Sequence, residues 1–235
     1  MTIARHLRDP VSLARLVWKN VCFPFTPQAA ELRYDRKLGI DTSGFVVPDE
    51  LGVGEGEGRA YMGTPPGIAH FLIGRIAQRA RGFTFLDVGS GKGRVLLIAS
   101  RFPFRKVVGF EHSEQMNAVA ASNVRQFAKH YPGMAPVEIV GGDATRLPLP
   151  EGPLVMFLFN PFGPGLMREF AASVKASYQQ SPRKIICLYY NALFPEEFDR
   201  LGIFAIREQV QTPRDRTDRY IKMKMPTVLL ETADR

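Results

Sequence analysis

From about residue 83 onward, short runs of apolar, β-branched and aromatic residues alternate with longer segments whose apolar positions have helical spacing. This alternation is typical of βαβ units, in which successive strands join one parallel sheet. Seven runs have the length and composition of strands: 84–88, 106–110, 137–140, 154–159, 184–190, 204–208 and 220–230. Four segments between them are predicted helices: 93–101, 114–130, 165–178 and 195–201.

Right-handed crossovers would place these helices on both faces of the sheet. The last two strands are joined by a loop containing Pro213 and Asp215, with no helix between them. Strands joined in this way favour an antiparallel pair at one sheet edge. The pattern therefore predicts a doubly wound, seven-stranded α/β sheet that is mostly parallel with an antiparallel edge strand.

Residues 1–82 follow a different pattern, and we interpret them as a helical N-terminal extension of a main domain at 83–235. A basic helix is expected near 11–20, followed by a proline-containing connection. The glycine- and glutamate-rich stretch 52–58 is predicted to be a mobile loop that covers a ligand. A helix is expected over 68–79, with Thr64 or a neighbour as its cap and a proline in its first turn.

The composition indicates the compartment of the protein and the state of its thiols, but it says little about function. No apolar run approaches the length that crosses a bilayer, and Cys22 and Cys187 have no CxxC or Cys/His spacing, so we expect reduced thiols, no metal site and a cytoplasmic protein. Arg15 interrupts the apolar stretch near the start, which argues against a secretory signal. The N-terminal helix then either caps the fold or makes weak contact with a membrane or other anionic surface.

The net charge of +8 allows nucleic-acid or acidic-protein partners without selecting among them. One modest basic cluster stands out: Arg214, Arg216 and Arg219.

The strongest chemical signal is a buried-strand pattern that runs into a glycine-rich turn and then a helix. The turn carries Asp87, Gly89, Ser90, Gly91 and Gly93. Glycines let the backbone turn sharply and approach a ligand, and a helix start offers free N–H groups. A nucleotide-like cofactor is therefore expected at this turn.

The spacing of the glycines decides among cofactor classes. Dinucleotide oxidoreductases use G-x-G-x-x-G, whereas this chain has Arg94 where the third glycine would fall. An ATP-binding P-loop is excluded because no GK[ST] follows at the required interval.

Acidic residues end the next two predicted strands. Glu111 lies 22 residues after Gly89, near the ~20-residue interval at which an acid binds ribose hydroxyls in such folds. Asp143 follows the third strand at the sheet edge where ligands bind, and could receive an adenine amino group. His112 and Ala144 are their neighbours and are expected near the adenosine.

With these elements the chain resembles, over residues 61–191, the class I S-adenosylmethionine-dependent methyltransferases, which have a Rossmann-like seven-stranded fold. The resemblance implies that the D-x-G-x-G-x-G loop contacts the methionine part of S-adenosylmethionine. It also implies that Glu111 holds the ribose and that Asp143 meets the adenine.

The fourth strand ends in Asn160-Pro161-Phe162-Gly163, which resembles the [DNS]-P-P-[aromatic] motif of amino-methylating enzymes. The resemblance implies that Asn160, with Pro161 and Phe162, contacts the acceptor nitrogen and lies beside the cofactor. Phe162 and Gly163 depart from the motif. The alternative is that Asn-Pro only begins a strand-to-helix turn.

A second element, Tyr61-x-x-Thr64-Pro65, resembles one found ahead of the glycine loop in some lysine methyltransferases of the same class. The resemblance implies that Tyr61 and Thr64 close the methionine end of the cofactor pocket; a hydrophobic anchor and helix cap is the alternative. Tyr189, Tyr190 and Asn191 end the fifth strand and are weaker candidates for substrate contact.

We therefore predict an S-adenosylmethionine-dependent methyltransferase that acts on nitrogen, with a protein side chain as the favoured acceptor. The alternatives are a nucleic-acid base or a small molecule as acceptor, a nicotinamide oxidoreductase, and a cofactor-binding regulatory protein without catalysis.

Overall fold

The computed structural model describes residues 27–46, 61–213 and 225–233. The predicted helix at 11–20, the loop at 52–58 and the basic cluster at 214–219 lie outside these residues, as does Cys22. Cys187 is buried and unpaired. None of the helices within the described ranges is both long and apolar enough to cross a membrane.

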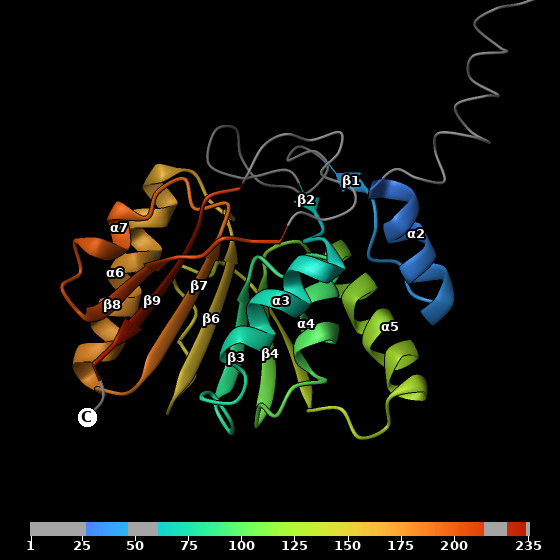
Figure 1. Cartoon of the computed structure of the whole chain (residues 1–235), viewed down its shortest axis with the longest axis horizontal. Coiled ribbons are helices and arrows are strands. Elements are labelled where there is room, and N and C mark those ends of the chain that lie inside the picture. Colours follow the sequence, from blue (N-terminus) through green and yellow to red (C-terminus); the bar gives the residue numbers. More distant parts are fainter. Residues whose placement is uncertain (1–26, 47–60, 214–224, 234–235) are drawn as a thin grey trace, which may run out of the picture.

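A seven-stranded sheet forms the centre of the chain (Figure 1). Its strands are β3 (Thr84–Val88), β4 (Lys106–Glu111), β5 (Val137–Gly141), β6 (Leu154–Phe159), β7 (Ile185–Tyr190), β8 (Phe204–Gln209) and β9 (Thr227–Thr232). The order across the sheet is β5-β4-β3-β6-β7-β9-β8, and β5 through β7 are parallel neighbours. β9 pairs antiparallel with both β7 and β8. The prediction of a mostly parallel sheet with an antiparallel edge is confirmed.

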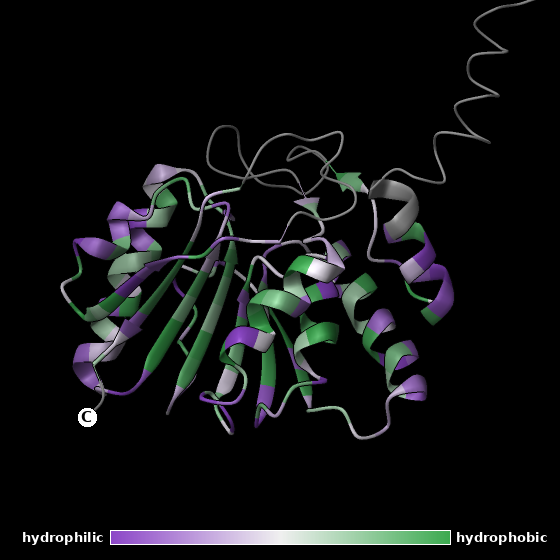
Figure 2. Ribbon diagram, in the orientation of Figure 1, coloured by the Kyte–Doolittle hydropathy of each residue, from purple (hydrophilic) through white to green (hydrophobic). Residues whose placement is uncertain are grey.

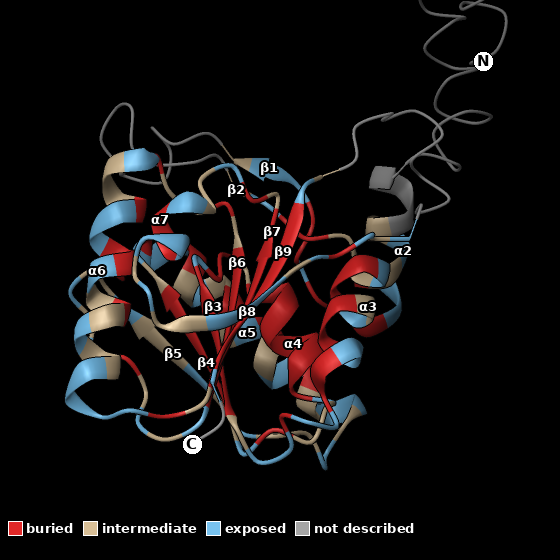
Figure 3. Cartoon of the chain, turned by 60° about the vertical axis from the view of Figure 1, so that its left-hand side comes forward, coloured by how far each residue is buried: buried red, intermediate tan, exposed pale blue. Residues whose placement is uncertain are grey.

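Helices cover both faces of this sheet, as Figure 3 shows. One face carries α3 (Pro66–Ile76), α4 (Arg94–Ala99) and α5 (Glu114–His130), and the other carries α6 (Pro164–Gln180) and α7 (Glu196–Asp199). Strands buried on both faces are apolar along their length, which Figure 2 shows in the centre of the sheet. This burial explains why the sequence has continuous apolar runs at β6 and β7.

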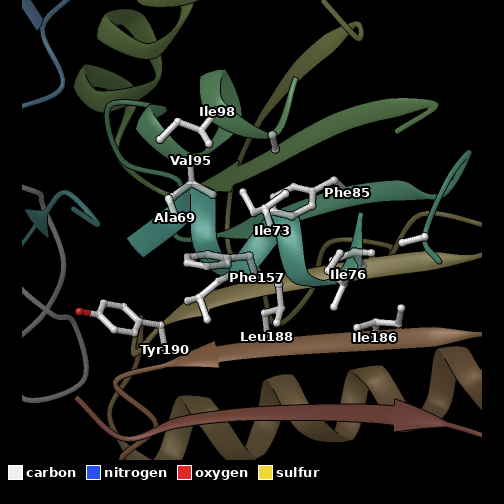
Figure 4. Packing of buried hydrophobic residues seen from close by; sticks show 14 of the residues in the cluster. Ala69, Ile73, Ile76, Phe85, Val95, Ile98, Phe157, Ile186, Leu188 and Tyr190 are labelled. Carbon is white, nitrogen blue, oxygen red and sulfur yellow. The ribbon is translucent and has the colours of Figure 1, made fainter. Parts of the chain in front are cut away.

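Alternate strand residues supply two separate cores. On one face, Ile73 of α3 packs with Phe85, Phe157 and Leu188 of three neighbouring strands (Figure 4). On the other, Met156 and Cys187 pack against α6 and α7. The two cores fix the register of β3, β6 and β7, and thereby the positions at which these strands end.

One helix and one pair of short strands were not predicted. Helix α2 (Pro27–Leu38) occupies the proline-containing connection, and its end packs with Ile40, Leu97 and Phe127 in a third, smaller core. The short strands β1 (Phe45–Val46) and β2 (Tyr61–Met62) pair antiparallel. Both elements lie close to the glycine-rich turn.

Helix α3 begins beside Thr64 with a proline in its first turn, as predicted, but it has no side-chain cap. Pro65, not Thr64, occupies the N-cap position. Because proline holds φ near −65° by itself, Pro65 and Pro66 set the start of α3 without a capping hydroxyl. Thr64 is buried, and its carbonyl has a different partner, described below.

Candidate cofactor and acceptor site

The glycine-rich turn connects β3 to α4 at the carboxyl edge of the sheet. The backbone N–H groups of Gly89 and Ser90 both donate to the Phe110 carbonyl, at 2.8 and 3.0 Å. Gly89, Gly91 and Gly93 all have positive φ, a conformation that glycine adopts without strain. The Ser90 side chain is buried, and its hydroxyl oxygen has no hydrogen-bond partner among the described residues. This hydroxyl points into the fold, where a Cβ atom added to Gly109 of β4 would lie 2.7 Å from it.

Glu111, at the end of β4, lies directly against this turn. Its Oε2 accepts a hydrogen bond from the Gly91 N–H at 2.9 Å, and its Oε1 accepts one from Ser113 at 2.9 Å. Each carboxylate oxygen has a further lone pair, so the group can also accept hydroxyl protons from a ribose. The structure brings the predicted ribose acid and the predicted glycine loop together.

Asp87 is almost completely buried in β3, one residue before the turn. Desolvation, reinforced by the nearby Glu111 carboxylate, raises the pKa of Asp87 well above its ordinary value. A cationic group bound at this turn would favour the ionised form. The two acids therefore make a site suited to a ligand that carries a positive charge.

Asp143 follows β5 two strands away from β3. Its Oδ1 accepts from the Thr145 N–H at 2.9 Å and from the Thr145 hydroxyl at 2.8 Å. Although desolvation opposes it, these bonds lower the pKa of Asp143. Ala144 is buried beside it, and His112 is exposed after Glu111. These residues lie at the same sheet edge as the turn.

Arg94, the residue that departs from the dinucleotide pattern, has a structural role that the sequence did not reveal. Its side chain is buried and hydrogen-bonds to four residues from three segments of the N-terminal region: Glu31, Thr42, Ser43 and Thr64. Nε donates to the Thr42 hydroxyl at 2.8 Å, and Nη2 donates to the Thr42 carbonyl at 2.7 Å. Arg94 therefore anchors the N-terminal segment to the start of α4.

Further contacts tighten the same junction. The Asp35 carboxylate accepts hydrogen bonds from Thr42 and from Ser43, at 2.6–2.7 Å. Lys92, inside the glycine turn, donates to Asp41 at 2.8 Å and to the Ser43 carbonyl at 2.9 Å. No predicted motif included these residues, because their interactions join positions far apart in the sequence.

Tyr61 packs directly on the turn. A Cβ atom added to Gly91 would lie 2.3 Å from Tyr61 Cε2, and the Tyr61 hydroxyl donates to the Thr42 carbonyl at 2.7 Å. Gly63 also lies close to Arg94, since its added Cβ would lie 2.6 Å from Arg94 Nη1. Thr64 contributes its carbonyl to Arg94 at 3.2 Å. The tyrosine therefore lies at the turn, whereas Thr64 lies behind it.

Asn160 and Pro161 follow β6 and approach the turn from the other side. Asn160 is buried and has a positive φ of 41°. A Cβ atom added to Gly89 would lie 3.0 Å from Pro161 Cβ. The ring of Phe162 points elsewhere, packing against Phe170 of α6 with 5.9 Å between centroids. Asn160 and Pro161 thus adjoin the glycine turn, and Phe162 belongs to the core.

No cluster of three or more histidine, cysteine or carboxylate side chains that could hold a metal ion occurs in the part of the chain that the structure describes. The residues that are present suit an adenosine-containing ligand, with a glycine turn and an acid that can bind hydroxyl groups.

Comparison with known proteins gives a consistent result. Residues 85–174 match a family model described as a methyltransferase domain. TrmN from Thermus thermophilus has a TM-score of 0.51 and 20% sequence identity, over 72% of this chain and 49% of that chain. This chain therefore spans about half the length of TrmN, and the likeness shows the fold.

Two further solved structures are similar at lower scores. A TehB-like SAM-dependent methyltransferase from Corynebacterium glutamicum has a TM-score of 0.49 and 14% identity, over 88% of this chain and 96% of that chain. A tRNA (uracil-54, C5)-methyltransferase from Pyrococcus abyssi, in complex with S-adenosyl-L-homocysteine, has a TM-score of 0.46 and 14% identity, over 74% and 42%.

Proposed function

We propose that this chain is a class I S-adenosylmethionine-dependent methyltransferase that methylates a nitrogen atom of a protein side chain. The match of residues 85–174 to a family model described as a methyltransferase domain supports the reaction class. The observation that carries the proposal is the contact of the Glu111 carboxylate with the Gly91 N–H, beside the Asn160-Pro161 turn. Through this contact, the acid proposed to bind adenosine and the glycine turn lie next to Asn160, the polar residue proposed to bind the methyl acceptor.

S-adenosylmethionine supplies, when bound, a methyl group on a positively charged sulfur that is itself the leaving group. In this proposal Glu111 accepts the ribose hydroxyls and Asp143 the adenine amino group. Asp87 and the backbone of the glycine turn hold the methionine end, with Tyr61 closing it. Enzymes of this kind gain rate mainly by aligning the two reactants.

Asn160 is the residue proposed to contact the acceptor. Its amide oxygen can accept a hydrogen bond from the acceptor nitrogen and orient the nitrogen lone pair, and it can stabilise positive charge that develops there. The proximity of Pro161 to Gly89 supports this role, because it brings the Asn160 turn to the glycine loop.

The proposal of a protein acceptor rests on the Tyr61-x-x-Thr64-Pro65 element. Its resemblance to lysine methyltransferases is supported by the packing of Tyr61 on Gly91, which makes this element part of the candidate site. A nucleic-acid base or a small molecule as acceptor, and cofactor binding without catalysis, are the alternatives.

The test uses tritiated S-adenosylmethionine with cell lysate separated into protein, RNA and small-molecule fractions. We expect label in the protein fraction with the wild type. The Asn160→Ala variant should bind S-adenosylhomocysteine normally by calorimetry while losing at least ~100-fold in labelling rate, as for a removed transition-state contact.

Glu111→Ala should instead lose cofactor affinity. Label in the RNA fraction or in the small-molecule fraction would show that the methyl acceptor belongs to that class and is not a protein. Cofactor binding without labelling of any fraction would favour a regulatory protein. Failure of the wild type to bind either S-adenosylmethionine or S-adenosylhomocysteine would refute the proposal as a whole.

A further inference from the structure

Two asparagines occupy equivalent positions at the ends of neighbouring parallel strands. Phe159 and Tyr190 form the last register pair of β6 and β7, and Asn160 and Asn191 follow them directly. Their φ angles are 41° and 50°, and they are the non-glycine residues with positive φ among those described. Positive φ is uncommon outside glycine, although asparagine adopts it several-fold more often than most residues. A compact polar side chain therefore follows the end of β6 and the end of β7.

Asn160 has one side-chain partner within the described residues, the hydroxyl group of Tyr189. The hydroxyl donates to Asn160 Oδ1 at 3.2 Å and accepts a hydrogen bond from the Phe194 N–H at 3.4 Å. The Tyr189 side chain is fully buried, and its ring packs edge-on against Phe198, with 6.0 Å between centroids. A rigid, buried hydroxyl thus contacts the amide proposed to meet the acceptor.

This arrangement decides which end of the Asn160 amide faces Tyr189. Since the Phe194 N–H donates to the hydroxyl oxygen, the hydroxyl proton must point to an acceptor of its own. Asn160 Oδ1 provides that acceptor. If the amide were reversed, its NH₂ group would face the hydroxyl, and the buried hydroxyl proton would lose its acceptor at a cost in free energy.

On the basis of the proposed function, we propose that Tyr189 is a positioning residue for the reaction. Its hydroxyl fixes the amide of Asn160 with the oxygen toward β7. One lone pair of that oxygen and both N–H groups then remain available to the acceptor, in a single orientation. Tyr189 acts through Asn160 and does not itself contact the reacting atoms.

The protonation state of Tyr189 agrees with this role. Burial raises the pKa of Tyr189 to about 12, so the hydroxyl keeps its proton at physiological pH. Because a neutral hydroxyl is needed to donate to Asn160, the contact persists over the range in which the enzyme would work.

The first experiment compares Tyr189→Phe with Tyr131→Phe in the full-length chain. Both changes remove a hydroxyl and keep the ring, but Tyr131 lies at the far end of α5, where its ring packs against Phe127. The assay measures labelling from tritiated S-adenosylmethionine in the lysate fraction that the wild type labels. We expect Tyr189→Phe to lower kcat about tenfold, the effect of one lost hydrogen bond. The KM for S-adenosylmethionine should not change.

Dependence on Asn160 separates positioning from general structural support. In the Asn160→Ala background, Tyr189→Phe should cause no further loss of kcat, because the amide through which Tyr189 acts on the acceptor is gone. Equal losses of kcat in the two backgrounds, or a Tyr189→Phe enzyme as fast as the wild type, would overturn the proposal.

The second measurement does not require an acceptor. The side-chain NH₂ signals of Asn160 in ¹⁵N–¹H NMR spectra can be assigned by their absence in Asn160→Ala. They should shift in Tyr189→Phe and stay in place in Tyr131→Phe. Unchanged signals in Tyr189→Phe would refute the contact. If the wild type labels no fraction, the proposed function fails. The NMR spectrum then still tests whether the Tyr189 hydroxyl holds the Asn160 amide.

Discussion

The contact between Gly91 and Tyr61 depends on the absence of a single side chain. At Gly91 the backbone has a φ of 52°, and an added Cβ would lie 2.3 Å from Tyr61 Cε2. A Gly91→Ala substitution must therefore strain the turn and displace the ring. We expect it to weaken S-adenosylhomocysteine binding at least tenfold in calorimetry.

Gly67→Ala is the matched control for this substitution. Gly67 lies in α3, and its added Cβ would meet no atom within 4 Å. Alanine in a helix is favoured over glycine by roughly 0.5–1 kcal/mol, so this variant should bind normally and be slightly more stable. Unaltered affinity in Gly91→Ala would show that the turn does not contact the cofactor.

Asp87 should make stability depend on pH in an unusual direction. Its pKa is raised in the folded protein above the ordinary value of 3.8. At pH values between the ordinary pKa and the raised pKa, the folded state binds more protons than the unfolded state. The contribution of Asp87 to stability therefore falls as the pH rises through this range. We expect Asp87→Asn to become progressively more stable relative to the wild type above pH 4, measured by urea unfolding.

Asp143→Asn provides the opposite case. The pKa of Asp143 is lowered in the folded protein, so its ionised form contributes stability at neutral pH that is lost in acid. The Asp143→Asn variant should therefore be less stable than the wild type at pH 7, with the difference shrinking as the pH falls below the ordinary value. For Asp87→Asn, a stability difference from the wild type that does not vary with pH would contradict a raised pKa of Asp87.

At the scale of elements, Arg94 links α2 and the β1–β2 pair to α4. Removing one member of a buried, hydrogen-bonded charge pair typically costs about 3–5 kcal/mol, and Arg94→Ala would leave Glu31 and the Thr42 carbonyl without this partner. We expect hydrogen exchange measured by mass spectrometry to accelerate at residues 31–46 and 61–64, with little change in β3 and β6.

Arg81→Ala serves as the control because Arg81 is exposed at the turn before β3. Arg94→Lys should fall between the two, since lysine keeps the charge and loses the planar fork that reaches several acceptors. Faster exchange spread evenly over the whole sheet would show that Arg94 supports the global fold and does not act as a local anchor.

The sheet and the glycine turn could be predicted from the sequence because their signals are local. A buried strand, a glycine run and an acid at the next strand end each occupy a few consecutive residues. The contacts of Arg94 could not be predicted, because the sequence shows only that an arginine replaces glycine. Its partners Glu31 and Thr42 lie 63 and 52 residues away.

Two local features differ from the prediction for physical reasons. Thr64 has the residue type of a cap, but Pro65 fixes the backbone at the start of α3. Helix α2 is largely polar and begins at a proline, and a segment of this composition is equally typical of a loop that connects two elements. Its packing on Leu97 and Phe127, supplied by distant segments, stabilises it as a helix.

At the scale of the whole molecule, Phe157 belongs to the core in which α3 packs on the sheet. This side chain is fully buried, and its ring stacks near that of Phe85, with 6.4 Å between centroids. Phe157→Ala should lower the free energy of unfolding by about 3–5 kcal/mol, as is typical of large-to-small changes in a core. Chemical denaturation followed by circular dichroism would measure the loss.

Phe45→Ala is the corresponding control, because Phe45 is 65% exposed. Its effect on unfolding should stay within roughly 0.5 kcal/mol, as for most surface substitutions. Equal losses in the two variants would mean that the stability of the chain does not depend on the core over which α3 packs.

The position of β9 has a consequence for how the chain is made. It is the last strand of the sheet in sequence, yet it lies between β7 and β8 and is buried along its whole length. During synthesis, β8 leaves the ribosome before the strand that links it to the rest of the sheet exists. One side of β7 therefore stays unpaired until residues 227–232 have joined the sheet, and an open strand edge of this kind is a template for wrong pairing.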